Sequence, residues 1–276
     1  MSRSVHLHHI AYSEATARSC PAGMQLLDNL ANERPDWWEY WPIRRFLLEQ
    51  PLDDEALYGF LSPKFQTKTG LDAQAVRQFI ATQGSGDIDA YLFSPQPDVG
   101  MLFENVFLGG ELFDPGFLGT SQDLLNAAGW QGDLRQIVMD SRTTVFSNYV
   151  IARPRFWRQW LQVCECVFLA AEQPGLRPDL WARLNQQTSY GASAQRKIFV
   201  IEGIASLILS AGGFQSRAIS PFAVPWFSAF SAHRAEAIGA DALKMAYRDT
   251  GQAEYLQRFR EVQADVLARL VPRARA

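Results

Sequence analysis

Short apolar runs alternate with segments of helical periodicity along the first part of this chain. β-Branched and aromatic residues predict strands over residues 5–12, 56–61 and 88–93, and the last two runs end in Ser-Pro. Between them the spacing predicts helices over 36–49, with Asp36 as N-cap and Pro42 as a kink or restart, and over 73–82, with Asp72 as N-cap. Strands that alternate with helices indicate βαβ units and therefore an α/β fold with a mostly parallel sheet.

The second half of the chain is richer in helical pattern. Apolar periodicity predicts helices over residues 99–107, 115–128, 154–171, 180–185 and 194–211, and strands over 144–152 and 217–222. From Ser228 onward, charges of both signs at helical spacings predict further helices. We therefore expect one α/β domain over residues 1–225 and a helical C-terminal extension over residues 226–276.

Composition indicates a globular protein of ordinary charge. The chain has 276 residues, of which 47% are hydrophobic, and its formal net charge is -3. At this length folding buries about 75% of the surface of the unfolded chain, so the core needs no disulfide or metal. The balanced charge contains no long basic run, which argues against a nucleic-acid partner. The three cysteines are an odd number and argue for a reducing compartment.

Targeting signals are not evident in the pattern. No secretory leader opens the sequence, and the most apolar run, 198–209, is interrupted by Glu202 and is shorter than the roughly 20 residues that a spanning helix needs. We expect a cytoplasmic protein with no transmembrane segment, and peripheral association with the inner face of the membrane is compatible with this pattern.

Charged residues in apolar surroundings are the first candidates for chemistry. Glu202 lies within the apolar run 198–209, so its carboxylate is either buried with a partner or directed into a cleft. Asp140 and Arg142 either form an ion pair with each other or bind a sugar hydroxyl and a phosphate. The sequence alone leaves both pairs of alternatives open.

A metal site has one candidate motif. Asp87-Ile-Asp89 is a D-x-D sequence, whose hard oxygens suit Mg²⁺ or Mn²⁺, but it precedes its strand, whereas ligands bind beyond the carboxyl ends of strands in open sheets. A solvated start of the strand is the alternative. His6, His8 and His9 alternate between the two faces of their strand, so they cannot converge on one metal without another partner.

An ordered series of short motifs suggests a family. In chain order they are 27–29 (LDN), 32–40 (NERPDWWEY), 58–60 (YGF), 62–65 (SPKF), 140–149, 188–190 (TSY) and Glu202. The series resembles the glycosyltransferase-like proteins of the GT-A type that are encoded among bacterial surface-polysaccharide genes. The resemblance covers residues 5–222 and leaves out the C-terminal extension. One departure is Gly203, where such relatives tend to have an arginine.

The resemblance implies a GT-A-like, Rossmann-like sheet and a transferase. A sugar would pass from a nucleotide sugar to a saccharide or lipid-linked acceptor of lipopolysaccharide, capsule or another glycoconjugate. Asp140 and Glu202 would be the catalytic carboxylates. The donor-binding residues would be Ser13, Asp28, Asn29, Tyr58, Lys64, Arg142, Asn148, Thr188, Tyr190, Arg196 and Lys197. Mn²⁺ or Mg²⁺ would be the cofactor if Asp87 and Asp89 hold a metal.

Two other functions are compatible with the same pattern. A non-catalytic protein of this fold would bind a saccharide or a partner transferase and act as a scaffold. A hydrolase of nucleotides or phosphate esters would use the same kind of sheet without an acceptor.

Overall fold

A six-stranded sheet forms the centre of the protein, for which a computed structural model describes residues 3–83, 87–191 and 194–270. The strands are β1 (Val5–Ala11), β2 (Gln25–Asp28), β3 (Leu57–Leu61), β4 (Ala90–Leu92), β5 (Val150–Ala152) and β6 (Ser216–Ala218). Their spatial order is β2-β1-β3-β5-β4-β6, and β5 alone of these strands is antiparallel to its neighbours. The expected α/β fold with a mostly parallel sheet is confirmed.

Both faces of the sheet are covered, which explains the continuous apolar runs in its central strands. Every residue of β3 is buried. One hydrophobic cluster contains Tyr58, Phe60 and Trp157, and the second contains Leu57, Leu61 and Ile151. Gly59 lets β3 and β5 approach closely, because a Cβ at this position would lie 2.6 Å from Cγ1 of Ile151.

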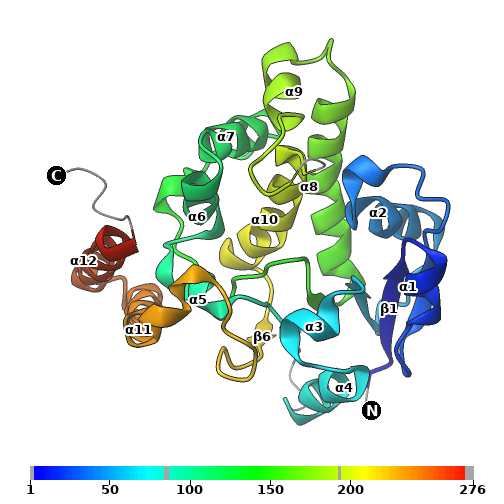
Figure 1. Cartoon of the computed structure of the whole chain (residues 1–276), viewed down its shortest axis with the longest axis horizontal. Coiled ribbons are helices and arrows are strands. Elements are labelled where there is room, and N and C mark those ends of the chain that lie inside the picture. Colours follow the sequence, from blue (N-terminus) through cyan, green and yellow to red (C-terminus); the bar gives the residue numbers. More distant parts are fainter. Residues whose placement is uncertain (1–2, 84–86, 192–193, 271–276) are drawn as a thin grey trace.

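Helices surround this sheet (Figure 1). The α-helices are α1 (Glu14–Arg18), α2 (Tyr40–Glu49), α3 (Phe65–Thr69), α4 (Ala73–Thr82), α5 (Pro97–Leu102), α6 (Val106–Phe113), α7 (Phe117–Ala127), α8 (Pro154–Glu172), α9 (Pro178–Leu184), α10 (Arg196–Ser210), α11 (Arg234–Thr250) and α12 (Ala253–Leu270). Three 3₁₀ helices are η1 (Pro35–Trp37), η2 (Leu134–Gln136) and η3 (Ala229–His233). The long helices α8 and α10 lie side by side in the centre of the view.

Local sequence signals placed several of these helices correctly. Helix α4 has the expected bounds, and the Asp72 carboxylate accepts a hydrogen bond from the Ala75 N–H at 2.8 Å as an N-cap should. Helix α8 begins at Pro154, where the missing proline N–H costs nothing.

Four expected elements differ from the structure. The strand predicted over 217–222 is found as β6 over Ser216–Ala218. The predicted helix over 99–107 is two helices, because the chain turns at 103–105 and Asn105 caps α6 through the N–H groups of Phe107 and Leu108. The predicted helix over 36–49 begins as η1 and restarts as α2 at Tyr40. The predicted strand over 144–152 pairs only over 150–152. Helices α1 and α3 and edge strand β2 were not predicted.

The C-terminal helices pack against α5 rather than against the sheet. Helix α5 lies between α10 and α11 in Figure 1, and α12 packs along α11. Phe230, Ala237 and Phe259 form a hydrophobic cluster with Met101 and Phe103. The extension is helical as expected over its described residues. No helix in the described part of the chain is long and apolar enough to cross a membrane.

Candidate functional site

A cavity of about 760 Å³ lies at the carboxyl edge of the parallel strands. Among its lining residues, Tyr12 follows β1, Ser62 follows β3 and Gln96 lies beyond the end of β4. Ser147 also lines it from the loop before β5, whose antiparallel direction brings its start to the same edge. Open α/β sheets bind their ligands at this edge, and the volume lies within the usual range for small-molecule sites.

Unusual backbone conformations gather at this cavity. Asn32, Trp38, Gln96 and Ser147 have φ angles of 40°, 46°, 56° and 59°, and all four line the cavity. Asn148, which follows Ser147, has a φ of 53°. Left-handed conformations are costly for residues other than glycine, and they cluster at functional sites where the surrounding structure enforces them. The strained residues therefore mark the cavity as the candidate functional site.

Two carboxylates face the polar part of the cavity. Glu202 lies in the middle of α10, and Glu39 lies immediately before α2. Burial and the nearby charge of Glu39 raise the pKa of Glu202 to about 7, although Lys68 and the Ser147 N–H favour its ionised form. Burial also raises the pKa of Glu39. A carboxylate that gains and loses a proton near neutral pH suits general acid–base catalysis.

Lys64 and Lys68 bring positive charge to the same part of the cavity. Both lie at the turn that follows β3, since Lys64 is the N-cap residue of α3 and Lys68 is in its last turn. The Lys68 Nζ donates a hydrogen bond to the Ser147 Oγ at 2.8 Å. Both ammonium groups favour the ionised form of Glu39. When either carboxylate is protonated, the two lysines leave a net positive charge that suits an anionic ligand. The other carboxylate can then accept a proton.

Aromatic side chains line the cavity in two groups. Trp38, Tyr190 and Phe199 are in mutual ring contact, with Tyr190 and Phe199 centroids 5.5 Å apart. A second group of aromatic side chains lines the cavity from α5, α6 and η3 and from the residues beside them. The Tyr12 hydroxyl is buried and has no hydrogen-bond partner within the described residues, and burial followed by the charge of Glu39 raises the pKa of Tyr12. Tyr12 lines the cavity, and its hydroxyl oxygen is turned away from the accessible surface.

The structure brings some of the expected site residues to the cavity. Lys64, Thr188, Tyr190 and Glu202 line it. Asn148 is 3% exposed, lies beside Ser147 and leaves its Oδ1 without a partner in the described residues. These residues come from four separate segments of the chain.

The expected residues after β1 and β2 lie near the cavity without lining it. Ser13 follows Tyr12 and is the N-cap of α1. Asn29 is buried, and its amide donates to the Asn32 Oδ1 at 3.4 Å. Asp28 is exposed, and its carboxylate accepts from the Leu30 N–H at 2.8 Å. These side chains shape the loops of the site.

Tyr58 lies away from the cavity. It is the second residue of β3, its ring stacks on His6 with centroids 4.9 Å apart, and its hydroxyl accepts from the Asp53 N–H. Its neighbourhood is the core and not a donor site.

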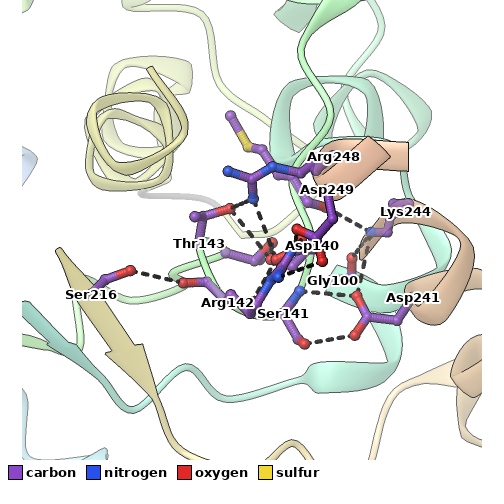
Figure 2. Close-up of polar contacts among 12 residues, drawn as sticks. Gly100, Asp140, Ser141, Arg142, Thr143, Ser216, Asp241, Lys244, Arg248 and Asp249 are labelled. Atoms are coloured by element: carbon purple, nitrogen blue, oxygen red, sulfur yellow. Dashed lines mark hydrogen bonds and ion pairs between the residues drawn. The ribbon is translucent and has the colours of Figure 1, made fainter. Parts of the chain in front are cut away.

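Asp140 and Arg142 belong to a polar cluster that fixes α11 (Figure 2). The Asp140 carboxylate is fully buried and accepts hydrogen bonds from the Arg142 guanidinium. It also forms an ion pair with Arg248, in which Nη1 lies 3.3 Å from the Asp140 Oδ1. Arg142 also pairs with Asp249. Neither residue lines the cavity. The structure thus favours the ion-pair alternative for Asp140 and Arg142 and gives Asp140 no access to a substrate there.

Arg196 and Lys197 are equally engaged elsewhere. Both side chains are 2% exposed. Arg196 forms a bidentate pair with Asp114, and Lys197 donates to the Asp36 carboxylate at 2.8 Å. The expected phosphate contacts of these two cations are replaced by internal ion pairs, because a charge this deeply buried needs a fixed partner.

The D-x-D sequence lies at the opposite edge of the sheet from the cavity. Asp89 precedes β4, is fully buried and pairs with Arg155, whereas Asp87 is exposed and pairs with Arg3 and Arg153. No group of three or more His, Cys, Asp or Glu residues in the described ranges is arranged to hold a metal ion. The expected alternative, a solvated start of the strand, holds for Asp87, whereas Asp89 is buried and held by its ion pair with Arg155.

Glu39, Lys68 and Ser147 were not among the site residues predicted from the sequence. Glu39 stands within the motif 32–40 of the resemblance, between tryptophans and acidic residues, and Lys68 lies four positions after Lys64. Those signals were present in the sequence. Ser147 gave none, since its role depends on a loop conformation.

Comparisons with protein-family models, with curated proteins and with solved structures found no match to this chain.

Proposed function

We propose that this protein is a glycosyltransferase that moves a sugar from a nucleotide sugar to a saccharide or lipid-linked acceptor. The observation that carries the proposal is the Glu202 carboxylate, whose pKa is raised to about 7 in a cavity that also holds Glu39, Lys64 and Lys68. A base and a pair of cations are the two things that transfer from a sugar diphosphate requires. The motif resemblance to GT-A-type proteins supplies the substrate class.

In the proposed reaction Glu202 takes the proton of the acceptor hydroxyl. The acceptor oxygen then bonds to the anomeric carbon while the bond from that carbon to the donor phosphate breaks, and the nucleoside diphosphate leaves with the bonding electrons. Lys64 and Lys68 neutralise the charge that develops on the departing diphosphate. Burial, together with the charge of Glu39, keeps the pKa of Glu202 high enough for this proton transfer.

The donor fits the side of the cavity that follows β1 and β3. Trp38 and Tyr190 offer ring faces for the base or the sugar. Mn²⁺ or Mg²⁺ that is bound with the donor diphosphate enters the proposal as a testable component. The proposed reaction takes place in the cytoplasm, where a lipid-linked acceptor is reached at the inner face of the membrane.

The test is a thermal-shift screen of UDP-, GDP-, CMP- and dTDP-sugars, with and without Mn²⁺. A ligand at about 100 times its dissociation constant adds about 2.7 kcal/mol to the stability of the folded state, which is easily measured. We expect a shift with one nucleotide class, followed by release of the nucleoside phosphate when an acceptor is added.

The Glu202→Gln variant is expected to bind the donor and to lose about 10²–10⁴-fold in kcat, since it removes the base and little volume. Glu33→Gln is the matched control, because Glu33 is exposed and does not line the cavity. Silence of the whole nucleotide panel would overturn the transferase proposal in favour of a scaffold. Nucleotide release that is independent of any acceptor would indicate a hydrolase instead.

A further inference from the structure

The second aromatic group makes one part of the cavity almost wholly apolar. We define this apolar half by Val99 of α5, Phe103, Val106 and Phe113 of α6, and Phe227 and Phe230 beside or within η3. The Phe103 ring contacts the rings of Phe113 and Phe230, with centroids 6.4 Å and 5.4 Å away. Phe103 and Phe230 belong to the hydrophobic cluster that the C-terminal helices share with α5.

Glycines in α6 leave room for these rings. A Cβ at Gly109 would lie 3.2 Å from the Phe103 ring, and a Cβ at Gly110 would lie 2.5 Å from the Phe117 ring. Larger residues would therefore move both rings. The two glycines keep the helix backbone close to the aromatic wall.

Polar groups in this half already have partners within the protein. The Asn105 amide donates to the carbonyls of Leu134 and Ile137, and its oxygen accepts from the N–H groups that it caps. The Asp114 carboxylate pairs with Arg196, and the Ser228 hydroxyl donates to Asp98. Among the described residues, the side chains of Asn105, Asp114 and Ser228 are thus already engaged within the protein, which favours an apolar ligand beside them over a polar one.

This half also opens to solvent. Phe113 and Phe227 line the cavity and are 53% and 48% exposed. Leu112, 50% exposed, continues the apolar surface outside the cavity. An elongated hydrocarbon group can thus enter the apolar half while the polar end of the same molecule reaches Glu202.

We propose that the apolar half binds the hydrocarbon part of an amphipathic acceptor, with the hydroxyl that receives the sugar directed to Glu202. The identification of this molecule as the acceptor rests on the proposed transferase function. The binding of a hydrocarbon group does not, and it is measured without a nucleotide sugar.

The experiment measures dissociation constants of the full-length protein for methyl, butyl and hexyl β-glucosides by titration calorimetry, below micelle-forming concentrations. Each methylene that leaves water strengthens binding about fourfold, so affinity should rise steadily with chain length. Phenyl β-glucoside, with as many carbons in its aglycone as the hexyl compound, distinguishes an aromatic from an alkyl occupant. Affinities that do not change from methyl to hexyl and phenyl glucoside would overturn the proposal.

Two pairs of variants locate the binding. Phe113→Ser should flatten the dependence on chain length, and Leu112→Ser should leave it unchanged, because the neighbouring side chains are equally exposed and only Phe113 lines the cavity. Ala229→Trp should fill the apolar half, and Ala232→Trp is its control in the same 3₁₀ helix outside the cavity. Equal effects within each pair would place the hydrocarbon elsewhere and overturn the proposal. No thermal shift with any nucleotide sugar would instead contradict the transferase function. That result leaves the glucoside titration unaffected, because the titration contains no nucleotide sugar.

Discussion

At the scale of single residues, Glu202 is a candidate for chemistry both in the sequence and in the structure. The apolar run around it indicated either a buried partner or a cleft, and the structure places the carboxylate in a cleft beside a second carboxylate, Glu39. The opposite outcome holds for Asp140, whose charge is used within the protein. Both are acidic residues in apolar surroundings, and only the positions of neighbouring charges separate their roles.

The raised pKa of Glu202 makes a prediction about stability. Its pKa is about 7 in the folded protein and near 4.5 when unfolded, so the folded state holds more protons between these values and stability falls as pH rises through them. Glu202→Gln removes this loss. We expect the variant to exceed wild type by roughly 2–3 kcal/mol at pH 8, after allowance for solvent in the cavity, and by close to nothing at pH 4.

Urea unfolding at the two pH values measures this difference. Glu33→Gln serves again as control and should change stability at neither pH, because Glu33 is exposed. A Glu202→Gln effect of the same size at both pH values would contradict the raised pKa.

At the scale of elements, capping and close packing decided which predictions were correct. Asp72 specified α4 within its own neighbourhood, and Pro154 did the same for α8. The expected helix over 99–107 failed because Asn105 caps a new helix inside an unbroken apolar pattern. Periodicity shows that residues on both α5 and α6 are apolar. It does not show that the two helices end and begin at 103–105 and are buried against different parts of the protein.

Lys244 connects α11 to α5 and to the loop after η2, and its replacement is expected to lower the free energy of unfolding substantially. It is fully buried, and its Nζ donates to the carbonyls of Gly100, Phe103 and Met139 at 2.7, 2.7 and 2.8 Å (Figure 2). Lys244→Met would leave these carbonyls without their donor, so we expect a loss of about 3 kcal/mol or more in the free energy of unfolding.

Chemical denaturation of the variant tests that loss. Arg258→Met is a suitable control, because the Arg258 pair with Glu261 is exposed and should contribute no more than about 0.5 kcal/mol. Equal losses in the two variants would show that Lys244 does not hold α11 on α5.

At the scale of the whole molecule, the C-terminal helices complete the wall behind the cavity. Phe103 lines the cavity, and its hydrophobic cluster includes Phe230, Ala240 and Phe259 from beyond residue 225. Lys244 and Asp241 join the same helices to the loop that leads to Ser147. The boundary predicted near residue 225 thus crosses a shared core.

A chain cut after residue 225 is accordingly expected not to form a stable domain. It would expose Met101 and Phe103 and lose the Lys244 contacts. We expect weak near-ultraviolet circular dichroism, strong binding of a hydrophobic dye and rapid proteolysis. A cooperative unfolding transition of this fragment, with native-like circular dichroism, would instead establish residues 1–225 as an independent domain.

The sequence by itself determined the α/β class, the central strands, the capped helices and the candidacy of Glu202, because each depends on neighbours within a few positions. The candidacy of Lys64 and Tyr190 came from the motif resemblance. Only the tertiary structure decided that Glu202 lies near Glu39 and Lys68. It also decided that Arg196 and Lys197 form ion pairs with Asp114 and Asp36, and that the D-x-D sequence lies at the other edge of the sheet from the cavity. Charges act through space over several ångströms. Their partners are therefore fixed by the packing of distant segments and not by the order of residues along the chain.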